Sequence, residues 1–114
     1  MDNYEFVELC IKKGNADESG QYKIGNKCYS LLISYYYELK ANGELNSLMP
    51  LLKHEECYVR LWSAYFLLNT NKNEAEKTLK DLCQLKGLIG ITAEMTLSEW
   101  KKGCLLYTSP SPRD

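Results

Sequence analysis

Residues 51–68 of the chain, LLKHEECYVRLWSAYFLL, join a short charged turn directly to a segment that is apolar on almost every side. When this segment is wound as a helix, Val59, Trp62 and Phe66 fall on one face, and the neighbouring face is also apolar. A helix with two apolar faces must be buried on two sides, because apolar surface in contact with water is unfavourable. The stretch therefore predicts the central helix of a small all-α domain.

Apolar residues recur at helical spacing along most of the remaining chain, and helix-ending residues separate the periodic segments. The first predicted helix runs from Asp2 or Asn3 to Gly14, and a polar turn at 15–19 separates it from a long second helix that ends near Ala41. The third helix is predicted from Glu44 to about Lys53 and the fourth near 56–69. The fifth is predicted at about 73–86, and the sixth from Leu88 or Ile89 to Lys102. Pro50 should bend the third of these helices, because proline removes a backbone hydrogen bond. The turns leave no room for a sheet. We therefore predict an all-α fold of about six helices.

The last eleven residues, CLLYTSPSPRD at 104–114, break this pattern and hold two of the three prolines. The string resembles the translation of a transposase sequencing adapter. We exclude it from the fold, as one would exclude an expression tag. We expect a single helical domain over 1–103 and a non-native, disordered tail over 104–114.

The overall composition narrows the class of protein. A net charge of -1 gives no electrostatic support for a nucleic-acid partner. No apolar run approaches the roughly 20 residues that cross a bilayer, and the acidic start of the chain does not resemble a secretion signal. The five cysteines are irregularly spaced without a CxxC pair, which is typical of free thiols in a reducing compartment. We expect a cytoplasmic protein that binds neither nucleic acid nor membrane.

The residues that could carry chemistry are few. His54 is the only histidine, so a triad or dyad would have to be built in the charged turn. His54 and Cys57 have the chemistry of metal ligands but lack the second pair that a zinc site needs. Glu94 and Glu99 are five residues apart and point in different directions on a helix. We predict no catalytic residues, no cofactor and no metal.

Arg60 is the charged residue of most interest, because it lies one turn into the helix predicted to be buried. An unpaired charge would be costly there, so Arg60 should meet a carboxylate or helix-end carbonyl groups, and Glu94 is the first candidate partner. We interpret Arg60 as a structural staple between helix pairs; the alternative is a ligand anchor. Trp62 and Trp100 lie at core spacing and are predicted to be packing residues.

Nine tyrosines are an unusual number for this length, and three are consecutive at Tyr35, Tyr36 and Tyr37. At about 100° per residue these three cannot all face one core, so at least one should reach the surface. Exposed tyrosine is favoured in partner contacts, and we take Tyr35 and Tyr37 as candidates. The alternative is a ring lying flat over neighbouring helices with only its hydroxyl in water.

The central segment also resembles the second helix of a HEAT-type repeat. The pattern consists of Val59 and Arg60 followed by Ala64 and Leu68, and Pro50 matches the proline-bent first helix of such a repeat.

Further segments extend the resemblance. The string AEMTLSEWKKG at 93–103 carries most of it, with support from 25–39, 51–54 and 87–90. Together they resemble a bacterial family of small HEAT-like helical proteins of unassigned function, whose members include proposed immunity proteins of polymorphic toxin systems. The likeness covers roughly 16–103.

The resemblance implies antiparallel helix pairs stacked in HEAT or armadillo fashion, with the long N-terminal helix capping one end. It also implies a non-catalytic protein-binding module, and in particular an immunity protein that sequesters a cognate toxin. For a nuclease toxin, the acidic groups Asp17, Glu18, Glu55 and Glu56 would meet basic residues of the partner.

Two other functions remain open at this point. One is an adaptor or scaffold that binds a peptide or protein through the region of Tyr35 and Tyr37. The other, more distant, is a small enzyme that uses Arg60, Glu94 and His54, which would require a deep pocket lined by those groups.

Overall fold

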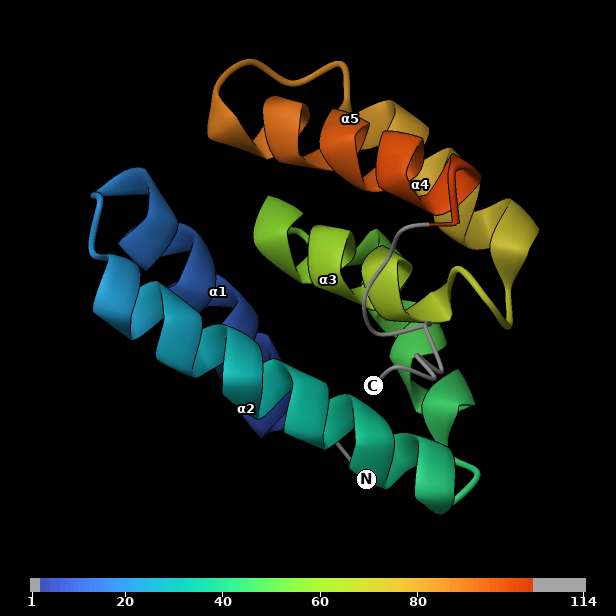
Figure 1. Ribbon diagram of the computed structural model, residues 1–114. Helices are drawn as coiled ribbons and strands as arrows, with labels where there is room; N and C mark the ends of the chain where they lie inside the picture. Colours follow the sequence, from blue (N-terminus) through green and yellow to red (C-terminus); the bar gives the residue numbers. More distant parts are fainter. Residues whose placement is uncertain (1–2, 104–114) are drawn as a thin grey trace.

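The computed structural model describes residues 3–103, and all regular structure in that range is helical (Figure 1). In chain order the elements are α1 (Tyr4–Glu18), α2 (Tyr22–Ala41), the 3₁₀-helix η1 (Leu45–Lys53), α3 (Cys57–Leu67), α4 (Lys72–Leu82) and α5 (Leu88–Lys101). The predicted all-α fold of about six helices is confirmed for these residues.

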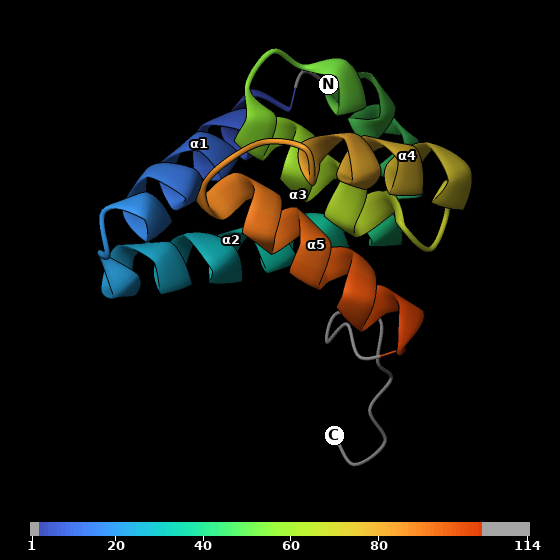
Figure 2. The same ribbon diagram turned by 90° about the horizontal axis from the view of Figure 1, so that it is seen from above.

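Helix α3 lies at the centre, between the α1–α2 pair and the α4–α5 pair (Figures 1 and 2). Helices α1, η1, α4 and α5 all pack against it. Every residue of α3 is buried except Cys57 and Arg60, which are half-buried. The prediction of a central helix buried on two sides is therefore confirmed.

The core around α3 is built largely from aromatic rings. Phe66 is fully buried, and the ring of Tyr36 from α2 stacks on it with centroids 5.0 Å apart and planes inclined by 16°. Phe6 from α1 meets the same ring edge-on at 6.1 Å. Complete burial of one large apolar side chain contributes about 1.5–3 kcal/mol. The burial of α3 therefore makes a major contribution to the stability of the fold.

Helix α1 is longer than predicted. Gly14 does not end it, and the stretch expected to be a polar turn remains helical through Glu18. Gly14 is buried under the ring of Tyr58, which occupies the space that a side chain would fill. The glycine is therefore required by packing between α1 and α3. The turn comes later, at Gly20, where φ is +75°.

Other boundaries also shift. The third helix is a 3₁₀-helix rather than an α-helix, and it contains Pro50, which disfavours the α-helical hydrogen-bond pattern. Helix α4 ends at Leu82, several residues before the predicted end at Lys86. The reason is tertiary, because the chain turns back there and the carbonyl of Leu85 packs directly on Gly90 of α5.

Candidate protein-binding surface

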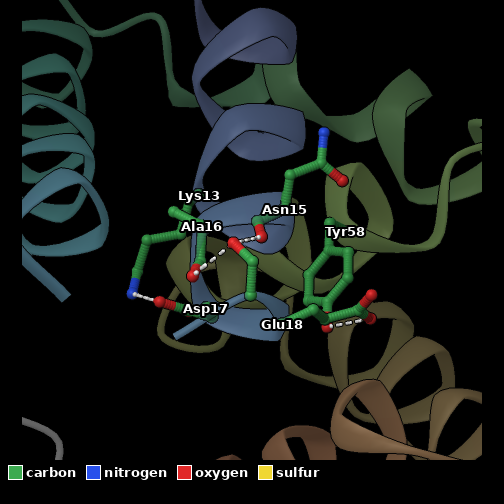
Figure 3. A network of polar contacts seen from close by, with 7 residues as sticks. Lys13, Asn15, Ala16, Asp17, Glu18 and Tyr58 are labelled. Atoms are coloured by element: carbon green, nitrogen blue, oxygen red, sulfur yellow. Dashed lines mark hydrogen bonds and ion pairs between the residues drawn. The ribbon is translucent and has the colours of Figure 1, made fainter. Parts of the chain in front are cut away.

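The end of α1 and the start of α3 meet at one edge of the molecule. There the hydroxyl of Tyr58 donates a hydrogen bond of 2.9 Å to Oε2 of Glu18 (Figure 3). Burial of the phenol, followed by the hydrogen bond to Glu18 and its negative charge, raises the pKa of Tyr58. The hydroxyl therefore stays protonated at neutral pH and holds the exposed Glu18 side chain in place.

Glu55 and Glu56 occupy the turn directly before α3 and are both exposed. Nη1 of Arg60 donates hydrogen bonds to the carbonyl oxygens of His54 at 2.6 Å and Glu55 at 3.2 Å. Nδ1 of His54 accepts a hydrogen bond of 3.0 Å from the backbone N–H of Glu56. These bonds hold the turn in one conformation. Because Tyr58 at the start of α3 binds Glu18, we group Glu18 with Glu55 and Glu56 and name these three residues the acidic edge.

Arg60 does not pair with Glu94, the first candidate partner. Glu94 is exposed on α5, and neither of the two ion pairs found within residues 3–103 joins it to Arg60. The guanidinium is near enough to the start of α3 to reach the carbonyl groups just before the helix. Arg60 is therefore a staple within its own turn rather than between helix pairs.

Asp17 is engaged in helix packing. Nζ of Lys13 lies 2.8 Å from Oδ2 of Asp17, and it lies over the rings of Tyr29 at 6.0 Å and Trp62 at 5.8 Å. Gly25 of α2 leaves room for this pair, since a Cβ there would lie 2.6 Å from Oδ1 of Asp17. The carboxylate predicted as a partner contact thus already has an intramolecular partner.

The three consecutive tyrosines face different surroundings, as predicted. Tyr36 is buried and Tyr37 is 49% exposed. Tyr35 is half-buried, with its ring 5.4 Å from that of Phe6 and its hydroxyl donating a 2.8 Å hydrogen bond to Oδ1 of Asn3. Since Asn3 directly precedes α1 and Glu18 ends it, the structure separates these tyrosines from the acidic edge.

The two tryptophans lie in different environments. Trp62 is 7% exposed in the core, and its Nε1 has no hydrogen-bond partner in the described part of the chain. Trp100 is half-buried, with its Nε1 3.5 Å from Oδ1 of Asn69 and its ring 5.5 Å from Nζ of Lys72. Trp100 therefore ties α5 to the loop before α4.

A surface feature that the sequence reasoning missed lies between the first half of α1 and the second half of α2. Two cavities of about 260 and 210 Å³ share Glu5, Tyr35 and Glu38. The other residues that line them are Tyr4, Leu9, Leu31, Ser34, Leu39, Asn42 and Glu44. We name these ten residues the α1–α2 groove. Among the residues that the structure describes, no lysine or arginine lines either cavity. The residues of the α1–α2 groove come from two segments about 30 positions apart, so no local sequence motif predicts the groove.

The groups with potential chemistry are scattered. Among residues 3–103, no three His, Cys, Asp or Glu side chains are grouped so as to hold a metal ion. Cys10 is buried, which raises the pKa of its thiol and makes it a poor nucleophile. Cys28, Cys57 and Cys83 are likewise free. None of the helices in this range is both long enough and apolar enough to span a bilayer.

Residues 4–100 match the family described as "Domain of unknown function (DUF2019)". The chain belongs to this family. The match to DUF2019 spans nearly all of the helical domain, from the start of α1 almost to the end of α5. No curated protein and no solved structure matches the DUF2019 chain. The segment 104–114, predicted to be a non-native disordered tail, lies outside both the family match and the described residues.

Proposed function

We propose that this DUF2019 chain is a non-catalytic, cytoplasmic protein-binding module that acts as an immunity protein by sequestering a cognate toxin. The acidic edge carries the proposal. Its three carboxylates are exposed, and contacts with Tyr58, Arg60 and His54 hold the segments that bear them. Charges positioned before binding speed association with an oppositely charged surface, and ordered segments lose less entropy when the complex forms.

The chemistry of the edge favours a basic partner. A toxin that cleaves nucleic acid must bind phosphate and therefore presents Lys and Arg side chains. Carboxylates that cover such a surface would exclude the substrate. The free thiols are consistent with a reducing compartment. The resemblance to HEAT-type repeats adds the proposal that the helix pairs stack, with the long helix α2 capping one end.

Co-expression with the product of the reading frame next to the gene tests the proposal. We expect the two proteins to purify as one complex and the chain to protect cells from its neighbour. The variant Glu55→Gln/Glu56→Gln should slow association by about tenfold at low salt and much less at high salt, because screening weakens the attraction. The matched control is Glu94→Gln/Glu99→Gln, which removes the same charge from exposed positions of α5. A toxic neighbour that is neither bound nor neutralised would contradict the proposal.

A scaffold that binds a peptide is the second candidate, and the α1–α2 groove beside Tyr35 favours it. An enzyme built from Arg60, Glu94 and His54 is disfavoured. The guanidinium of Arg60 already binds two backbone carbonyl groups, and Glu94 is exposed on another helix.

A further inference from the structure

The α1–α2 groove combines apolar surface with carboxylates. Leu31 is 45% exposed, Tyr4 is 66% exposed, and Leu9 is half-buried. Glu5 and Glu38 are exposed and contribute to both cavities. Single apolar side chains scattered over a protein surface are ordinary, but here several of them line the same cavities.

The carboxylates of the groove have no positive partner within the described residues. Glu5, Glu38 and Glu44 take part in neither of the two ion pairs of residues 3–103, which lie within α1 and within α4. A further exposed carboxylate, Glu8, lies one helical turn after Tyr4 on α1. Three carboxylates without a positive partner in residues 3–103 give the hollow a negative potential, which attracts a cation.

The wall of the groove is formed before any ligand binds. The hydroxyl of Tyr35 donates to Oδ1 of Asn3, and Nδ2 of Asn3 donates to the carbonyl oxygen and Oγ of Ser47 at 3.0 and 3.1 Å. Asn3 is 4% exposed, so these bonds are shielded from water. They tie α2, the start of α1 and η1 together. A ligand would therefore meet a pre-ordered surface, which lowers the entropy lost on binding.

The apolar side chains and the carboxylates that line the groove together define the occupant. Phosphate groups of nucleic acid or of an anionic lipid surface would be repelled by the carboxylates. A wholly polar cation would leave the leucines in water. An amphipathic helix with apolar residues on one face and Lys or Arg beside them satisfies both features, and the long stems of these cations can lie along apolar surface.

We propose that the α1–α2 groove binds a basic amphipathic helix of a partner protein, whose apolar side chains contact Leu9 and Leu31 and whose Lys or Arg side chains meet Glu5, Glu38 and Glu44. The inference rests on the proposed function only in that the chain binds protein. It uses a surface other than the acidic edge, so the two can fail separately.

The first test is selection from a library of displayed helical peptides randomised in charge and hydrophobicity, with the full chain as bait. We expect enrichment of peptides that combine leucine-like residues with Lys or Arg at helical spacing. An enriched peptide is then synthesised with a fluorophore, together with a counterpart in which every Lys and Arg is Glu. In fluorescence anisotropy the counterpart should bind at least about tenfold more weakly.

Variants of the chain then locate the site. Glu5→Gln/Glu38→Lys and, separately, Leu31→Ser should each weaken binding of the selected peptide by about tenfold. Lysine at 38 lies in the last turn of α2, where the helix dipole favours positive charge, so the fold should persist, and circular dichroism checks this. The matched control is Glu55→Gln/Glu56→Gln at the acidic edge, which should change peptide affinity less than about twofold, as expected for a site outside the groove.

Four results would overturn the inference: a selection that enriches no basic apolar peptide, equal binding of the acidic counterpart, groove variants that bind as the wild type does, or equal weakening by the acidic-edge control. Binding to vesicles of anionic phospholipid in place of the peptide would also overturn it. If the acidic-edge variant lost toxin binding but still bound the selected peptide, the two surfaces would be shown to act separately. That result would support both this inference and the proposed function.

Discussion

Gly14 of α1 lies directly beneath the ring of Tyr58 of α3. Replacement of a helical glycine by alanine normally stabilises by about 0.5–1 kcal/mol. At this position the added methyl group would occupy the space of the ring, and overpacking costs about 1–3 kcal/mol. We expect Gly14→Ala to lower the free energy of unfolding in urea. In a Tyr58→Ala background the same change should be neutral or stabilising. A more stable Gly14→Ala protein would contradict the packing.

The ring of Phe66 is the second target, because it meets Phe6 and Tyr36 from two other helices. Phe66→Ala should destabilise by about 3–5 kcal/mol, the range for buried aromatic residues. Ile91→Ala serves as the control, since Ile91 is 55% exposed on α5, and its effect should stay within about 0.5 kcal/mol. Similar losses for the two variants in thermal unfolding would argue against α3 as the centre of the core.

The partner of Arg60 can be tested by two single substitutions. Arg60→Ala removes the hydrogen bonds to the carbonyl oxygens of His54 and Glu55 and should cost about 1.5–3 kcal/mol, the range for bonds that involve a charged group. Glu94→Ala should change stability by less than about 0.5 kcal/mol, as expected for an exposed residue without such bonds. Equal and non-additive losses would instead indicate that the two side chains form a pair.

The pKa of Tyr58 predicts how stability depends on alkaline pH. Burial, the hydrogen bond to Glu18 and nearby negative charges raise this pKa above its ordinary value of 10.0. The folded state therefore holds the phenol proton more tightly than the unfolded state does. The resulting stabilisation is fully present below pH 10 and is lost as the pH rises from there through the folded pKa.

Comparison with Tyr58→Phe isolates this contribution. Below pH 9, at which the phenol is protonated, the variant should be less stable by about 1–3 kcal/mol, because it lacks the bond to Glu18. Between about pH 10 and 12, where unfolded tyrosine ionises, the wild type should lose stability more steeply than the variant. Parallel curves of unfolding free energy against pH would show that the environment of Tyr58 is misassigned.

The central helix could be predicted because its signal is local. The apolar residues of 51–68 are dense enough to cover two faces of a helix, and the turn before them is charged. Burial on two sides then follows in any compact arrangement. The exposure of Tyr37 was predictable for a related reason, since helical geometry alone prevents three successive residues from facing one core.

The surroundings of the candidate contact residues were only partly predictable from the sequence. Glu18, Glu55 and Glu56 are exposed, but Asp17 is paired with Lys13, and Tyr35 and Tyr37 lie elsewhere on α2. Pairing of Asp17 depends on room provided by Gly25 of a different helix. The groove was missed because its carboxylates and leucines belong to two helices, and no sequence pattern states which faces of those helices meet.

The sequence by itself determined that residues 3–103 are all-helical and that α3 is their centre, because helical periodicity and apolar density depend only on neighbouring residues. Only the tertiary structure decided that Gly14 lies within a helix and that Arg60 binds the carbonyl groups of the turn before α3. It also decided that carboxylates of α1 and α2 line the same groove. Each of these depends on contacts between segments distant along the chain, and local propensity carries no information about such contacts.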